Sequence, residues 1–176
     1  VNGDVENSRV NAAGFVIHSA IHMAREDLNC VIHTHTAAGM AVAAQEHGLL
    51  PITQHALKFY GKLAYHTYEG IALSMDERER LVADLGTHKA MILRNHGLLV
   101  GGKSVAHAFH ELHFLERACQ AQIQALSGNS KLIQPSPEVC RLAAQQFDRE
   151  EAEEIIQLSW KATLTLIEEQ RESYCS

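Results

Sequence analysis

The chain has 176 residues, of which 46% are hydrophobic and 20% charged, with a formal net charge of −6. This length suffices for one domain with a sizeable core, and the composition is far from that of a disordered chain. The negative charge and the lack of any Lys/Arg cluster exclude a typical nucleic-acid-binding protein, and no apolar run approaches the ~20 residues of a membrane span.

The first part of the chain alternates helical and strand patterns. Residues 12–25 repeat apolar side chains at helical spacing behind Asn11, a favourable N-cap. Residues 29–35 are β-rich, and residues 37–46 are mostly small residues that favour a helix. The sequence from Leu50 to Ala72 shows no regular pattern apart from a short strand expected over residues 62–66.

The middle of the chain contains two apolar strands. A capping-box pattern opens a helix expected over residues 74–87. Residues 90–94 and 98–100 then predict strands, which are interrupted at Asn95-His96-Gly97. The interruption places His96 in a turn or a bulge.

The last part of the chain is helical. Ser104 caps a long helix over residues 105–126, and Gly128 stands at the expected C′ position. Two more helices are expected over residues 137–147 and 149–171.

These elements predict an α/β protein. We expect one domain over residues 1–130, followed by a helical tail over residues 131–176 that packs on the same domain or on a neighbouring subunit. The opening Val1-Asn2-Gly3-Asp4 is typical of a turn inside a longer protein, so we expect that an N-terminal part of the domain is missing. The cysteines show no C-x-x-C pair, and without a secretory leader a cytoplasmic location is expected.

Twelve histidines are unusually many for a chain of this length. His33 and His35 alternate along an expected strand, so both side chains share one face about 6.5–7 Å apart and could bind one cation. The alternative is that both are polar residues on a solvated face. His96 follows a strand sixty residues later, and its own surroundings favour a capped histidine in a turn over a metal ligand.

Other histidines give weaker signals. His18 and His22 share a helix face, but Ser19 stands where the metalloprotease motif requires Glu, so we interpret them as a helix flank. We expect His107 and His110 at the surface. His113 lies nearer the apolar stripe, where it could support a metal ligand.

Five blocks of sequence resemble the class II aldolase/adducin domain in order and spacing: residues 11–15, 18–21, 30–36, 48–52 and 92–98. The resemblance extends from Val10 to Gly128. It implies a three-layer α/β/α sandwich around a mixed, mainly antiparallel sheet, with early strands and a phosphate loop ahead of the first helix. It also implies a homotetramer with sites between subunits.

The resemblance further implies site residues. His33, His35 and His96 fall on the histidines that hold zinc, or another divalent cation, in the sugar-phosphate aldolases. His55 or Tyr174 could then supply a proton from a neighbouring subunit. Three imidazoles would leave one tetrahedral position open for a ligand, as in catalytic zinc sites.

One departure from the aldolase pattern leaves the function open. Gly14 stands where the aldolases carry a Glu that acts as acid and base, and Ala12 and Ala13 replace serines that contact phosphate. Adducin heads, which are not known as enzymes, have a similar sequence at these positions. The sequence therefore leaves two functions: a zinc-dependent lyase acting on small hydroxycarbonyl compounds, or a non-catalytic adducin-head-like binding and assembly module with a structural or vestigial metal. In either case we expect negligible cleavage of the usual sugar phosphates.

Overall fold

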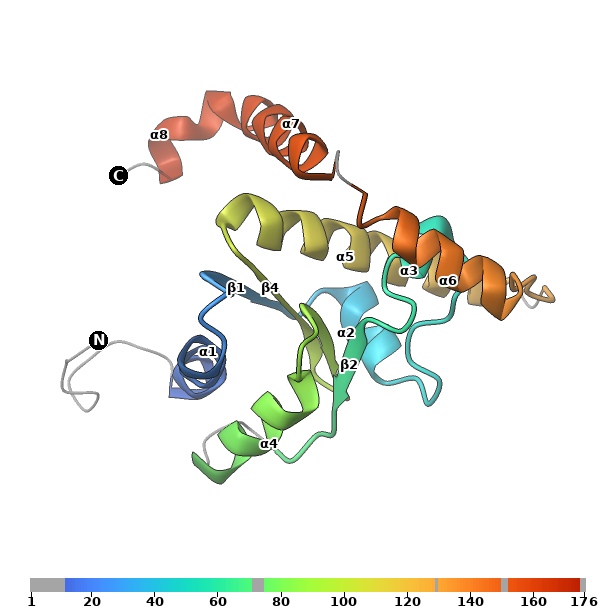
Figure 1. Cartoon of the computed structure of the whole chain (residues 1–176), viewed down its shortest axis with the longest axis horizontal. Coiled ribbons are helices and arrows are strands. Elements are labelled where there is room, and N and C mark those ends of the chain that lie inside the picture. The colour runs from blue at the N-terminus through green and yellow to red at the C-terminus, as the bar shows by residue number, and fades with distance from the viewer. Residues whose placement is uncertain (1–11, 71–74, 129, 150–151, 175–176) are drawn as a thin grey trace.

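The computed structural model describes residues 12–70, 75–128, 130–149 and 152–174, and its centre is a mixed β-sheet (Figure 1). The strand order is β1 (Cys30–Thr34), β4 (Gly97–Gly102), β3 (Ala90–Leu93) and β2 (Leu63–His66). β4 is antiparallel to both β1 and β3, whereas β2 is parallel to β3. The predicted mixed, mainly antiparallel sheet is confirmed.

Helices cover both faces of this sheet (Figure 1). The helices among the described residues are α1 (Ala12–Ala24), α2 (Ala37–Ala43), α3 (Gln54–Leu57), α4 (Met75–Leu85), α5 (Val105–Ser127), α6 (Pro137–Gln146), α7 (Ala152–Leu166) and α8 (Arg171–Tyr174), with a 3₁₀ turn over Glu168–Gln170. α1 and α4 pack on one face, and α2 and α5 pack on the other. This is the expected three-layer α/β/α arrangement.

Two cores result from the strand pleat, which sends alternate side chains to opposite faces. On the α1/α4 face, Ile21, Leu85 and Met91 belong to one buried cluster. On the α2/α5 face, Leu98 and Leu115 belong to a second. Each fully buried side chain of this size contributes about 1.5–3 kcal/mol of transfer free energy, so the sheet is held firmly between the helical layers.

Two short elements differ from the sequence expectation. α2 ends at Ala43 rather than near residue 46. α3 was not predicted, because a single turn is too short to show helical periodicity. It is nevertheless capped, since the Thr53 side chain accepts a hydrogen bond from the Ala56 amide at 3.1 Å.

The C-terminal part of the chain has an interruption that the sequence did not predict. The single helix predicted over residues 149–171 is interrupted after Leu166. In α7 the hydroxyls of Thr163 and Thr165 donate to carbonyls four residues back, at 2.9 and 3.1 Å, and such bonds compete with regular helix hydrogen bonding. Gly128 follows α5 as expected, but with φ −93° it is not left-handed.

Both of the longer helices in the described part of the tail contact the rest of the chain. α6 contacts α3, and α7 contacts α5 on the side away from the sheet (Figure 1). The division at residue 130 stays a prediction. The expected caps at Asn11 and Ser74 lie outside the described residues. Where the chain is described, no helix combines the length and apolar character needed to cross a membrane.

Candidate metal centre

The β3–β4 turn places His96 beside the end of β1. Asn95 has a left-handed backbone with φ 55°, and its amide donates to the Ala43 carbonyl at 3.1 Å. Gly97 approaches β1 so closely that a Cβ there would lie 2.3 Å from the Thr34 carbonyl oxygen. The absence of a side chain at Gly97 therefore lets the turn lie against β1.

Hydrogen bonding orients the His33 ring. In the antiparallel β1–β4 pair His33 is opposite Leu99, and its Nδ1 lies 2.9 Å from the Leu98 carbonyl oxygen. A carbonyl oxygen can only accept, so we assign the ring proton to Nδ1. Nε2 then carries a lone pair that is available to a cation, and the ring is held as metal-binding histidines usually are.

The three predicted ligands converge on one point. The Nε2 atom of His33 lies 2.7 Å from that of His35 and 3.3 Å from that of His96. The candidate ligand atoms of all three lie within 4.8 Å of one another. The ring centroids are 4.6–4.7 Å apart and the rings meet edge to face. Below, these three residues are called the histidine triad.

Burial favours the neutral imidazoles that bind metals. It lowers the pKa of His33 to about 4, with neighbouring His96 and His35 acting in the same direction and the Leu98 carbonyl opposing them. Burial, and then His35, also lowers the pKa of His96. Both rings are therefore deprotonated at neutral pH, which is the state that a cation requires.

Three imidazole nitrogens suit a transition-metal cation of intermediate softness. Imidazole nitrogens are good ligands for zinc, copper, iron and nickel, and three of them leave a tetrahedral site one open position. Across the described ranges, the histidine triad is the one group of three His, Cys, Asp or Glu side chains found with this proximity. The residues present therefore fit a divalent cation.

The histidines of α1 and α5 lie in other surroundings. The His22 Nδ1 lies 3.0 Å from the Leu28 carbonyl oxygen, which agrees with a helix-flank role. The expectation that His107 and His110 are surface residues was wrong: both are half-buried, whereas His113 is exposed. α7 packs over this part of α5, and spacing along one helix does not reveal such a contact.

Proton donation by His55 or Tyr174 of a neighbouring subunit stays a prediction. The His55 ring, on α3, stacks on Phe114 of α5 with centroids 4.9 Å apart. Tyr174 ends α8, and its side chain lies outside the described residues. Gly14 lies in α1 and provides no carboxylate.

Sequence reasoning missed one residue beside the triad. The Tyr68 ring lies 6.3 Å from the His96 ring, centroid to centroid, at an angle of 72°. Tyr68 follows β2, which runs parallel to β3, and the Arg94 amide donates to the His66 carbonyl at 2.8 Å. That pairing carries the chain beyond β2 alongside the turn that holds His96. No motif around Tyr68 signals this position.

Comparisons with known proteins identify relatives of this chain. Residues 1–123 match the family described as the class II aldolase and adducin N-terminal domain. A Pseudomonas aeruginosa protein, provisionally named as a class 2 aldolase, is 44% identical over 168 residues, which are 94% of this chain and 65% of that protein. Rat alpha-adducin is 48% identical over 122 residues, 69% of this chain and 16% of that protein.

Solved structures give the same result. An aldolase II superfamily protein from Pseudomonas syringae has a TM-score of 0.84 and 53% identity, covering 98% of this chain and 67% of that one. The L-fuculose 1-phosphate aldolase of Glaciozyma antarctica has a TM-score of 0.77 and 29% identity, covering 96% and 65%. The chain belongs to the class II aldolase and adducin N-terminal domain family.

Proposed function

We propose that this protein binds one divalent cation, zinc in the first instance, through His33, His35 and His96. The observation that carries the proposal is the convergence of three imidazole nitrogens, one of them oriented by the Leu98 carbonyl. The open position would take a small hydroxycarbonyl or hydroxy-acid ligand. A bound cation would supply charge stabilisation to an oxygen of that ligand.

This chain's own residues set the limits of the chemistry. Aldol cleavage requires a proton acceptor and a proton donor, each typically worth 10²–10⁴-fold in rate. Gly14 has no side chain that could accept or donate a proton. We propose His55 and Tyr174 of a neighbouring subunit as the groups available for proton transfer, and we expect the protein to bind such ligands but to cleave sugar phosphates negligibly.

A second function is favoured by a specific similarity. Rat alpha-adducin is 48% identical to this chain over 122 residues. A non-catalytic binding and assembly module, in which the cation is structural, is therefore the alternative to a lyase. We propose a cytoplasmic homo-oligomer, with a tetramer as its simplest form, for either function.

The metal test uses protein freed of metal and then exposed to zinc. We expect about one zinc per chain, and loss of most of it in His33→Ala and in His96→Ala, because removing one of three ligands destroys affinity without removing a core side chain. His47→Ala is the matched control, since His47 is exposed and is not part of the triad. Undiminished zinc in both triad variants would contradict the site.

The same zinc-loaded samples are then tested for lyase activity. L-fuculose 1-phosphate is the first substrate to offer, and negligible cleavage is expected from the wild-type protein. Robust cleavage that disappears in His33→Ala would identify a lyase in which another residue has replaced the missing carboxylate. Zinc binding without cleavage is the expected result, and it excludes only a lyase that acts on this sugar phosphate.

A further inference from the structure

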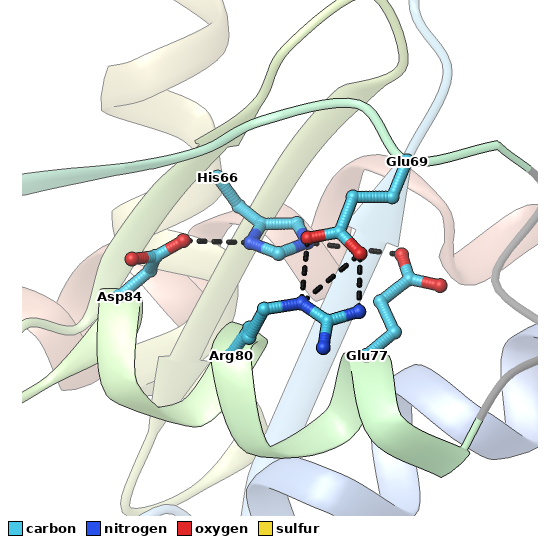
Figure 2. Close-up of polar contacts among 5 residues, drawn as sticks. All are labelled: His66, Glu69, Glu77, Arg80 and Asp84. Atoms are coloured by element: carbon cyan, nitrogen blue, oxygen red, sulfur yellow. Dashed lines mark hydrogen bonds and ion pairs between the residues drawn. The ribbon is translucent and has the colours of Figure 1, made fainter.

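Tyr68 is an exposed aromatic residue beside the triad. Its side chain is 48% exposed, although its ring lies 6.3 Å from that of His96. An isolated exposed tyrosine would be ordinary. This one differs because the residues on both sides of it are tied to α4 by polar contacts (Figure 2).

The first contact is made by His66, two residues before Tyr68. His66 is only 4% exposed, and its Nδ1 lies 2.7 Å from a carboxylate oxygen of Asp84. On the opposite side of the ring, Nε2 faces the Glu77 carboxylate at 3.7 Å and has no hydrogen-bond partner among the described residues. Figure 2 shows the imidazole between these two acids of α4.

The second contact is made by Glu69, directly after Tyr68. Arg80 of α4 donates to both carboxylate oxygens of Glu69, with its Nε at 2.8 and 3.1 Å from them (Figure 2). A planar guanidinium that meets a carboxylate in this forked manner fixes its direction as well as its distance. Arg80 lowers the pKa of Glu69, so the carboxyl group is charged at neutral pH.

A third contact ties the same segment to the triad's own turn. The Arg94 amide, two residues before His96, donates to the His66 carbonyl at 2.8 Å. α4 and the β3–β4 turn therefore hold the chain at His66, and α4 holds it again at Glu69. Tyr68, between them, keeps a defined place beside His96 while its ring stays accessible.

We propose that Tyr68 contacts the ligand held at the histidine triad, and that His66 and Glu69 are positioning residues that keep it there through α4. This inference rests on the proposed function. The ring offers an apolar face to the carbon skeleton of a hydroxycarbonyl compound, and the phenol offers a hydrogen bond to its hydroxyl groups. Tyr68 thus selects the ligand, and the triad holds the cation.

The test uses the whole chain with cobalt in place of zinc, because cobalt(II) absorbs visible light and reports on its own coordination. Two quantities are measured for each variant: the affinity for cobalt, and the Kd for dihydroxyacetone phosphate from the ligand-induced change in absorption. Tyr68→Ala should raise the Kd about tenfold and leave the cobalt affinity within twofold of wild type. Tyr60→Ala, which removes a half-buried tyrosine beside α3, is the matched control.

The positioning role is tested with Glu69→Gln, because this ion pair is partly exposed and its loss leaves the core intact. Glu69→Gln should raise the Kd for dihydroxyacetone phosphate severalfold when Tyr68 is present. In protein that already carries Tyr68→Ala, it should not raise the Kd further. Equal effects in both backgrounds would overturn the positioning role.

Failure of the inference and failure of the proposed function give different results. Cobalt and ligand binding that are unchanged by Tyr68→Ala would overturn the inference and leave the metal site standing. Cobalt binding without any ligand binding by the wild type would overturn the inference and the ligand part of the proposed function. No cobalt binding by the wild type would overturn both.

Discussion

Gly97 is the residue on which the geometry of the histidine triad depends most directly. A Cβ at this position would meet the Thr34 carbonyl oxygen at 2.3 Å and His35 Cδ2 at 3.3 Å. The first of these atoms belongs to the backbone of β1, so relief would require the strand to move. His35 is one of the residues that would move with it.

Gly97→Ala should therefore lower the free energy of unfolding by about 1–3 kcal/mol, the usual cost of overpacking, and weaken zinc binding. Gly128→Ala is the control, because Gly128 has an ordinary φ of −93° and a new Cβ there would lie 3.9 Å from the Ser130 Oγ atom. Urea denaturation and zinc titration measure the two effects. Equal behaviour of the two variants would refute the steric argument.

His110 gives the protein a dependence of stability on pH. Burial lowers its pKa to about 4, with Lys58, His113 and His107 acting in the same direction and Glu111 opposing them. In the unfolded chain the pKa is near 6.5. Between these values the unfolded state binds more protons, so the stabilising contribution is complete above pH 6.5 and is lost as the pH falls toward 4.

We expect the free energy of unfolding of the wild type to fall more steeply than that of His110→Gln between pH 6.5 and 4. The difference in slope corresponds to at most about one proton. Urea denaturation at several pH values measures it, and below pH 4 the two slopes should become equal. Parallel curves throughout the window would show that His110 does not carry the effect.

At the scale of elements, α5 holds the loop that follows α2. Gln122 of α5 is fully buried, and its amide nitrogen donates to Gln45 Oε1 at 2.7 Å and to the Gly48 carbonyl at 2.8 Å. Its amide oxygen accepts from the Leu50 amide at 2.7 Å. The same loop accepts a hydrogen bond from Arg94 at the Gln45 carbonyl, which connects α5 to the turn that carries His96.

Gln122→Leu would leave buried backbone groups of this loop without partners, which typically costs about 1–3 kcal/mol for each group. We expect a loss of stability of about 2–4 kcal/mol and a smaller loss of zinc affinity through the Arg94 contact. Gln124→Leu, at an exposed position of the same helix, should change neither by much. A Gln122→Leu protein as stable as wild type would contradict the role of this side chain.

At the scale of the whole molecule, α7 lies on the surface of its own chain. It contacts α5, but none of its residues is buried. Its side chains Leu158 and Leu166 are 58% and 85% exposed. Exposed apolar side chains gathered on one helix are typical of surfaces that another molecule covers.

Light scattering at micromolar concentration should therefore find a homo-oligomer. Leu158→Glu together with Leu166→Glu should lower its mass, because a charge buried without a partner in an interface is costly. Ile133→Glu is the control, since Ile133 is 90% exposed but lies outside α7. A monomeric wild type would contradict the proposed assembly and would remove His55 and Tyr174 as donors from a neighbouring subunit.

The sequence by itself determined the local elements. The Ser104 cap and the apolar periodicity after it predicted α5 to within one residue of its end, and the β-rich runs predicted all four strands of the described sheet. Capping and periodicity depend on neighbours a few residues apart, so they can be read from a single chain. His33, His35 and His96 were named at the same stage, the last of them chiefly through resemblance to a family.

Tertiary structure alone decided which distant segments of the chain lie next to each other. His96 reaches His33 because β1 pairs with β4 in one register and Gly97 permits close approach, and neither fact has a local sequence signal. Tyr68 reaches the triad because β2 runs parallel to β3, and His107 is half-buried because α7 returns across α5. Contacts between segments tens of residues apart depend on how the whole chain packs, which short-range patterns do not encode.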